Sequence, residues 1–188
     1  MIRKTRQAFR SFFVKDFERL FLDFPDPWNL DKSNFQKKRF TKIEKIIKNI
    51  PHKTILEIGS AEGHLTKYLT NRSDNVTCLE ISKQAIKRAK LRAPRAKYIN
   101  SSFQNYNFNS QKFDLIICSE VLYYLKNKKE AVAKMEKMAD FILMSNFGLW
   151  DVLFSFYFKQ MSPIKKTFVF HLLELKFGII SLWSKKHV

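Results

Sequence analysis

The chain of 188 residues lacks the features that mark membrane-spanning and secreted proteins. No run of 18 uninterrupted apolar residues occurs, so no membrane-spanning helix is predicted. The basic N-terminus has no long apolar core with a small-residue cleavage site, which argues against a secretory signal. Only two cysteines are present, Cys78 and Cys118, and both lie in apolar, strand-like segments. Two isolated, buried thiols indicate a reducing cytoplasm and exclude a disulfide framework.

Acidic residues are scarce relative to basic ones. Asp and Glu total 17 against 35 Lys and Arg, which gives a formal net charge of +18. A basic surface attracts polyanions through counterion release. The basic side chains are nevertheless spread along the whole chain, with no basic tail or arginine cluster. Nucleic acid and peripheral contact with an anionic membrane are therefore the less favoured partners.

Metal-ligand patterns and internal repeats are also missing. His52, His171 and His187 stand alone in the sequence, and His64 follows a glycine turn, where a helix-start side chain is expected rather than a base. We therefore expect no metal site. Without repeats or a low-complexity linker, a chain of this length predicts one domain with a full core, as a monomer or a weak dimer.

Strands and helices alternate through the middle of the chain. Short, near-continuously apolar strands suit a parallel sheet that is covered on both faces. The alternation predicts a doubly wound α/β fold with right-handed crossovers. The expected strands are residues 54–58, 76–80, 97–100, 113–119 and 141–146, and the expected helices lie near 63–71, 83–93 and 126–139.

The two ends of the chain depart from this alternation. Residues 1–24 predict an amphipathic helix closed by two prolines, and helical spacing of apolar residues predicts a second helix up to residue 50. Residues 1–50 are therefore expected to form a helical cap segment on a domain of residues 51–188. Near the C-terminus, residues 167–178 predict a helix and residues 179–186 a final strand.

The most informative stretch is ILEIGSAEG, residues 55–63. Its two glycines allow a sharp turn and a close approach of the backbone to a ligand. Glu80 ends the next strand, where an acidic side chain can accept hydrogen bonds from both hydroxyls of a ribose. Glu57 lies just below the turn, where it would repel a phosphate and attract an ammonium group, so a cationic nucleoside such as S-adenosylmethionine is favoured over a dinucleotide. The residues expected to hold it here are Glu57, Gly59, Ser60, Ala61, Gly63, Glu80 and Ile81.

A second signature is FDLIICSEVLYYL, residues 113–125. In an open α/β sheet, ligands lie beyond the carboxyl ends of the strands, at the point where the strand order reverses. Ser119 and Glu120 should therefore converge with the glycine turn. Glu120 and Tyr123 are the candidates for taking a proton from an amine acceptor. Two alternatives stay open. In the first, Glu120 only stabilises the positive end of a helix dipole. In the second, Tyr123 and Tyr124 only pack against their neighbours.

These motifs resemble the class I S-adenosylmethionine-dependent methyltransferases. Together with DPWNLDKSNFQKKRF, residues 26–40, the segment SEVLYYL resembles the nodulation protein S group of that class. The resemblance covers about residues 25–175 and implies a mostly parallel, Rossmann-like sheet with helices on both faces. We expect about six strands, because the chain stops before the further antiparallel strand of the family. The resemblance also implies that Trp28 is an apolar lid over the cofactor, with plain core as the alternative.

One departure from the family lies at the position expected to bind the adenine ring. The family usually places an aspartate after the third strand, where this chain has Ser102, so Ser102 or the backbone of Phe103 is expected to hold the adenine. The resemblance implies methyl transfer to a small molecule or a glycan, with a sugar amine as one candidate. A nucleic-acid (RNA) methyltransferase is the first alternative, although the chain lacks an N/D-P-P-Y/F motif. A non-catalytic cofactor-binding or membrane-associated protein is the second.

Overall fold

The computed structural model describes residues 16–147, 156–157, 159, 162–171 and 176–185. Its helices are α2 (Phe17–Asp23), α3 (Asn34–Ile47), α4 (His64–Leu69), α5 (Lys83–Arg92) and α6 (Lys128–Met138), with a short 3₁₀ turn, η1 (Leu122–Tyr124). Its strands are β1 (Thr54–Ile58), β2 (Asn75–Glu80), β3 (Lys97–Asn100), β4 (Phe113–Ser119), β5 (Ala139–Phe147), β6 (Ser162–His171) and β7 (Lys176–Ser184).

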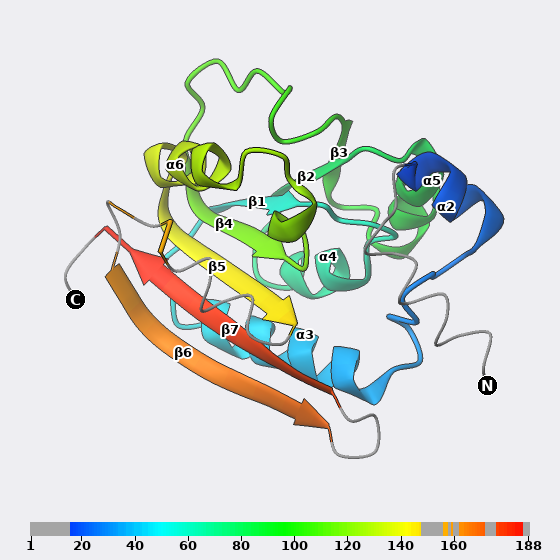
Figure 1. Ribbon diagram of the computed structural model, residues 1–188, viewed down its shortest axis with the longest axis horizontal. Coiled ribbons are helices and arrows are strands. Elements are labelled where there is room, and N and C mark those ends of the chain that lie inside the picture. The colour runs from blue at the N-terminus through cyan, green and yellow to red at the C-terminus, as the bar shows by residue number, and fades with distance from the viewer. Residues whose placement is uncertain (1–15, 148–155, 158, 160–161, 172–175, 186–188) are drawn as a thin grey trace.

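The described strands form one sheet in the order β3-β2-β1-β4-β5-β7-β6. Strands β1 to β5 run parallel, whereas β7 is antiparallel to β5 and β6 is antiparallel to β7 (Figure 1). The predicted doubly wound, mostly parallel fold is confirmed. The strand order reverses between β1 and β4, so the carboxyl ends of these two strands flank the switch point where such folds bind ligands.

The C-terminal part of the sheet differs from the prediction. The helix expected over residues 167–178 is wrong for residues 167–171 and 176–178, which lie in β6 and β7, and residues 172–175 lie outside the described residues. The described strands form a sheet of seven, where the sequence suggested about six. The run IKKTFVF within β6 is rich in β-branched and aromatic residues, which favour strands. Pairing with β7 runs from Ser162 opposite Ser184 to His171 opposite Lys176, with an irregularity after Pro163. Proline has no backbone N–H and would break the hydrogen-bond ladder of an interior strand. β6 lies at the edge of the described sheet, where the missing N–H is tolerated.

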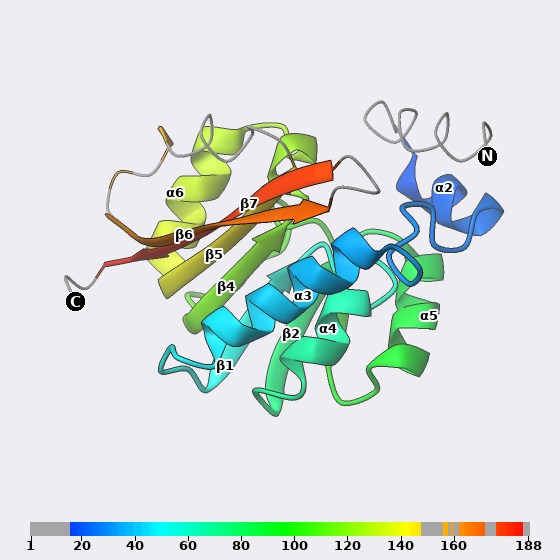
Figure 2. The same cartoon turned by 90° about the horizontal axis from the view of Figure 1, so that it is seen from below.

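Helices cover both faces of the sheet, as Figure 2 shows for α3 and α4 on one side and α6 on the other. Successive residues of β1 and β4 point to opposite faces, so Ile55 and Leu115 pack under α3 and α4. Leu56 and Ile116 pack against α6 and the segment before β4. Because both faces are buried, these strands are near-continuously apolar, as the sequence pattern predicted.

The N-terminal elements begin and end at other residues than expected. Helix α3 starts at Asn34, because Ser33 caps it by accepting a hydrogen bond from the Gln36 N–H at 3.3 Å. Of the helix predicted over residues 1–24, only α2 falls within the described residues. The division into a cap of residues 1–50 and a domain of residues 51–188 stays a prediction. Within the described ranges, no helix is both long and apolar enough to cross a membrane.

Candidate functional site

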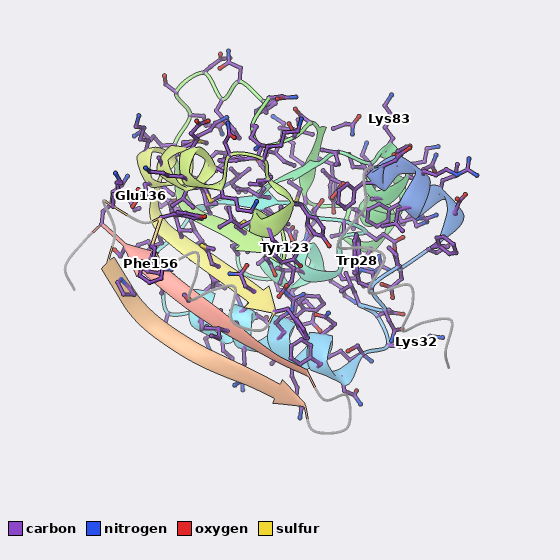
Figure 3. All side chains as sticks on the ribbon, viewed as in Figure 1. Trp28, Lys32, Lys83, Tyr123, Glu136 and Phe156 are labelled. Atoms are coloured by element: carbon purple, nitrogen blue, oxygen red, sulfur yellow. The ribbon has the colours of Figure 1, made fainter. Side chains whose placement is uncertain are left out.

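A cavity of about 350 Å³ lies at the carboxyl ends of β1, β2 and β4, roofed by α2 and the loop before α3. This volume is in the range of small-molecule sites. Figure 3 shows that Trp28 and Tyr123 both lie on the side to which the parallel strands point. Except for Gly63, every predicted site residue lines the cavity: Trp28, Glu57, Gly59, Ser60, Ala61, Glu80, Ile81, Ser102, Phe103, Ser119, Glu120 and Tyr123.

The two glycines of the turn have different roles. Gly59 has φ +74°, and a Cβ there would lie 2.4 Å from a methyl group of Val121, so the turn requires glycine. Gly63 has φ +78° and starts α4, where a Cβ would lie 3.0 Å from the Cα of Ala89 on α5. Gly63 therefore allows α4 and α5 to pack closely, which fixes the turn from outside the cavity.

Glu80 lies at the end of β2 with its carboxylate already oriented. One oxygen accepts a hydrogen bond from the Ala61 N–H and the other from the Ser82 N–H, both at 2.9 Å. Burial raises the pKa of Glu80, and these backbone donors oppose the rise. Each carboxylate oxygen keeps a further lone pair. The group can therefore accept hydrogen bonds from two neighbouring hydroxyls without moving.

Glu57 is the second buried carboxyl group of the cavity. It is buried, and one of its oxygens accepts hydrogen bonds from the Thr66 hydroxyl at 2.6 Å and the Cys78 thiol at 3.4 Å. Burial raises its pKa to about 7, and the nearby Glu80 adds to the rise. An ammonium group in the cavity would stabilise the ionised form, so the site favours a cationic ligand.

Arg39 was missed by the sequence analysis, although it lies in the DPWNLDKSNFQKKRF segment. It is 3% exposed and projects from α3 to the ends of β4 and β5. Its Nη1 donates to the hydroxyls of Ser119 at 2.5 Å and Ser145 at 3.2 Å, and lies 3.3 Å from a Glu120 oxygen. The signal that could have revealed it is its position on the apolar stripe of α3, beside Phe40.

Glu120 and Tyr123, the predicted catalytic pair, are in contact. The Tyr123 hydroxyl donates to one Glu120 oxygen at 3.0 Å, and the Phe147 N–H donates to the same oxygen at 3.0 Å. Burial and the neighbouring Glu120 raise the pKa of Tyr123 well above its ordinary value, so the phenol stays protonated. Glu120 has φ +59°, an unfavourable conformation for glutamate that aims its carboxylate at Arg39 and Tyr123.

The residues expected near the adenine line the opposite part of the cavity. Ile81 is 47% exposed, so it offers an apolar surface for a planar base. The Ser102 hydroxyl accepts a hydrogen bond from the Asn105 N–H at 3.2 Å. The Phe103 side chain is buried, and its carbonyl oxygen accepts a hydrogen bond from Lys134 at 2.8 Å. Lys134 and the core therefore hold the chain that follows β3 in a fixed position beside the cavity.

The strand order, the cavity at the switch point and the glycine turn flanked by two carboxylates define a class I S-adenosylmethionine-dependent methyltransferase. More particularly, the chain belongs to the nodulation protein S family. The family model described as Nodulation protein S (NodS) matches residues 12–148, which include α2, the glycine turn and the SEVLYYL segment.

Individual relatives agree with this assignment. The chain is 33% identical over 132 residues to Nodulation protein S of Azorhizobium caulinodans, which covers 69% of this chain and 63% of the relative. It is 37% identical over 107 residues to Ribosomal RNA small subunit methyltransferase A of Mesomycoplasma hyopneumoniae, covering 54% and 41%. The chain thus spans less than two thirds of the length of either relative.

A solved structure shares the fold. The crystal structure of the N-methyltransferase NodS from Bradyrhizobium japonicum WM9 in complex with S-adenosyl-L-homocysteine superposes with a TM-score of 0.78 at 20% sequence identity. The match covers 90% of this chain and 96% of that one.

The burial of Glu57 predicts how stability depends on pH. Its pKa rises from 4.5 to about 7, so the folded chain holds a proton that the unfolded chain releases between these values. Stability therefore falls as pH rises through this window, and above pH 7 the carboxylate costs on the order of 3 kcal/mol. Glu57→Gln can still accept from Thr66, so it should raise the free energy of unfolding of the ligand-free chain at pH 8 but not at pH 4.5.

Urea titrations at the two pH values measure this effect. Asp114→Asn is a control of opposite sign, because backbone donors at Lys53 and Thr54 lower the pKa of Asp114, so this change should destabilise the chain at pH 8. A Glu57→Gln chain that is no more stable than the parent at pH 8 would show that Glu57 is not strained by burial.

Proposed function

We propose that the chain binds S-adenosylmethionine and transfers its methyl group to an amine of a small molecule or glycan. The observation that carries the proposal is the convergence of Glu57, Glu80 and Arg39 on one cavity. These groups complement an ammonium, a ribose diol and a carboxylate, which are three of the polar groups of this cofactor. The guanidinium nitrogen Nη2 is engaged by no described residue, so it can donate to the ligand carboxylate.

When bound, the cofactor supplies an electrophilic methyl group on a sulfonium. The protein's contribution is alignment, because holding the nucleophile in line with the methyl group supplies most of the rate. Tyr123, Tyr124 and Phe147 line the cavity beside Glu120 and exclude water from this region. A largely apolar wall of this kind favours a neutral amine, the form that can attack.

Glu120 and Tyr123 are proposed to move the proton that the amine loses. The Tyr123 hydroxyl donates to Glu120, and a phenol oxygen can also accept a hydrogen bond, which gives an acceptor amine a group to donate to. The proton can then pass from the amine to Tyr123 while the phenol proton passes to Glu120. Arg39 lies 3.3 Å from the other Glu120 oxygen and orients this carboxylate toward Tyr123.

An amine acceptor is supported by the similarity to a protein described as an N-methyltransferase. Cys78 and Cys118 are both buried and free, which supports the proposal that the chain works in the reducing cytoplasm. We further propose that residues 1–50 form a cap over a domain of residues 51–188, since α2 and Trp28 line the cavity, and that the chain is a monomer or a weak dimer.

A second candidate is methylation of RNA. Two observations favour it: the net charge of +18 and the 37% identity to a ribosomal RNA methyltransferase over 107 residues. The spread of basic residues along the chain and the absence of an N/D-P-P-Y/F motif argue against a site for a flipped base. We therefore rank it second, ahead of a non-catalytic cofactor-binding or membrane-associated protein.

Cofactor binding is tested first at Glu80. Loss of two hydrogen bonds to a charged acceptor costs about 1.5–3 kcal/mol each, so Glu80→Ala should weaken S-adenosylhomocysteine binding by at least tenfold. Calorimetry measures the affinity, and thermal melts of the ligand-free chain report any folding loss. Glu44→Gln, which removes a carboxylate that pairs with Arg72 at 2.9 Å and does not line the cavity, should bind normally. Unchanged affinity in Glu80→Ala would remove Glu80 from the site.

The lid proposal is tested at Trp28, which is half-buried and packs edge-on against Phe21 at 5.2 Å. Trp28→Ala should raise the Kd for S-adenosylhomocysteine several-fold and leave most of the stability intact. Trp183→Ala is the matched control, because Trp183 is 4% exposed in the core and its loss should cost about 3–5 kcal/mol. If Trp28→Ala melts like Trp183→Ala yet binds with normal affinity, Trp28 is core rather than lid.

The acceptor and the proton relay are tested together with radiolabelled S-adenosylmethionine. The acceptors are a chitooligosaccharide with one free amine, its fully acetylated form and ribosomal RNA. We expect transfer to the free amine alone, slowed about a hundredfold in Glu120→Gln, with cofactor affinity within a few-fold of the parent. Tyr123→Phe should slow transfer similarly. Labelling of RNA alone would promote the second candidate, and cofactor binding without transfer to any acceptor would favour the non-catalytic one.

A further inference from the structure

A second cluster of titratable side chains lies outside the cavity. One oxygen from each of the Asp26 and Glu62 carboxylates and one ring nitrogen of His64 lie within 4.8 Å of one another. Asp26 lies in the loop before α3, whereas Glu62 and His64 flank Gly63 at the start of α4. None of the three lines the cavity, so the proposed methyl transfer leaves this cluster without a role.

His64 is the unusual member of the cluster. It is 6% exposed, and neither of its ring nitrogens has a hydrogen-bond partner among the residues that the structure describes. Buried polar atoms are nearly always hydrogen-bonded, because an unpaired one loses its interactions with water and gains nothing in return. Two unpaired ring nitrogens beside two carboxylates are the arrangement expected of a metal ligand, because an imidazole nitrogen binds a metal ion through its lone pair.

We propose that Asp26, Glu62 and His64 form a site for a divalent transition-metal ion of the zinc type. One imidazole and two carboxylates suit Zn²⁺ or Co²⁺ better than Mg²⁺ or Ca²⁺, which prefer oxygen ligands alone. Bonds of about 2.0–2.2 Å place opposite ligand atoms no more than about 4.4 Å apart. Only a small inward movement of these side chains is therefore needed, and water completes the coordination.

The surroundings of Glu62 fix its orientation. Its Oε1 accepts from Arg88 at 2.7 Å and from the Asp26 N–H at 3.0 Å, which leaves Oε2 for the ion. Arg92 donates to the Glu62 carbonyl oxygen. These partners act as the outer shell that orients a ligand. Three carboxylates, those of Asp26, Glu62 and Asp31, face the guanidiniums of Arg88 and Arg92, so negative charge is in excess around the cluster. This excess favours a bound cation, although the two arginines reduce its affinity.

The proposed ion connects two segments of the fold. Asp26 is followed by Pro27 and Trp28, so an ion held by Asp26 anchors the loop that carries Trp28 to the cavity. Its other ligands belong to the glycine turn and to the start of α4. The ion therefore links the loop before α3 to the start of α4. It lies outside the cavity and does not contact the cofactor or the acceptor.

The test uses the full-length chain, freed of metal by a chelator and studied without cofactor, so its outcome is independent of the proposed function. Zn²⁺ titrated in a calorimeter should bind as one ion per chain, and Mg²⁺ should not bind. Co²⁺ should give visible d–d absorption without the near-ultraviolet thiolate band that Cys78 or Cys118 would produce. Bound Zn²⁺ should also raise the melting temperature, because the ion binds only the folded site.

Two variants assign the ligands. Asp26→Asn keeps a side chain that tolerates φ +48° and caps the loop, and His64→Gln keeps a polar side chain of similar length. Each should weaken Zn²⁺ binding at least tenfold, while melts without metal show whether the fold is intact. The control is His52→Gln, whose ring is already bonded to the Ile50 carbonyl at 2.7 Å and which should bind Zn²⁺ like the parent. Asp31→Asn removes a nearby charge but no ligand, so it should weaken Zn²⁺ binding far less than Asp26→Asn.

Three results would overturn the proposal. The first is a parent chain that binds no Zn²⁺. The second is binding that survives unchanged in a folded Asp26→Asn chain. The third is a thiolate band, or loss of binding in His52→Gln, since either would place the ion elsewhere.

Discussion

The cavity depends on one buried cation. Arg39 ties α3 to the ends of β4 and β5 by contacting Ser119, Ser145 and Glu120. Removing a charge from water is costly, and here the cost is offset only because several acceptors meet around the guanidinium. Since these acceptors lie at the ends of the neighbouring strands β4 and β5, the arginine holds α3 against this end of the sheet. The orientation of Glu120, and through it that of Tyr123, follows from this contact.

Two carboxyl groups are buried on the other side of the same cavity, and each raises the cost of ionising the other. Glu57 receives only a hydroxyl and a thiol as donors, whereas Glu80 receives two backbone N–H groups. Glu80 is therefore the better hydrogen-bonded carboxylate, and Glu57 is the one that gains most from a cationic ligand. Burying these two carboxylates without a ligand costs free energy. A ligand with a positive charge and a vicinal diol offsets this cost, because it interacts with both carboxylates.

Much of this could be predicted from the sequence, because the relevant signals are local. The strands β1 to β5 are short apolar runs, and the glycines and carboxylates that follow them occur at the ends of those runs. Strand order then brings Glu57, Glu80 and Glu120 to one cavity. Arg39 could not be found this way, because its partners Ser119 and Ser145 lie 80 and 106 residues further along the chain. Residues 167–171 and 176–178 were predicted as helix because this apolar stretch has no turn residue to separate two strands. Their strand structure follows from the pairing of β6 with β7 and of β7 with β5, which the sequence pattern does not show.

The order of strands also constrains how the chain assembles. Strand β6 precedes β7 in the sequence but lies outside it, and among the described strands β6 pairs with β7 alone. During synthesis, β6 therefore leaves the ribosome before the strand that can receive it, while β5 waits with an open edge. β7 pairs with both of them, so the edge of β5 is covered only once the last described strand is in place. Until then this edge is a place where a nascent chain can mispair.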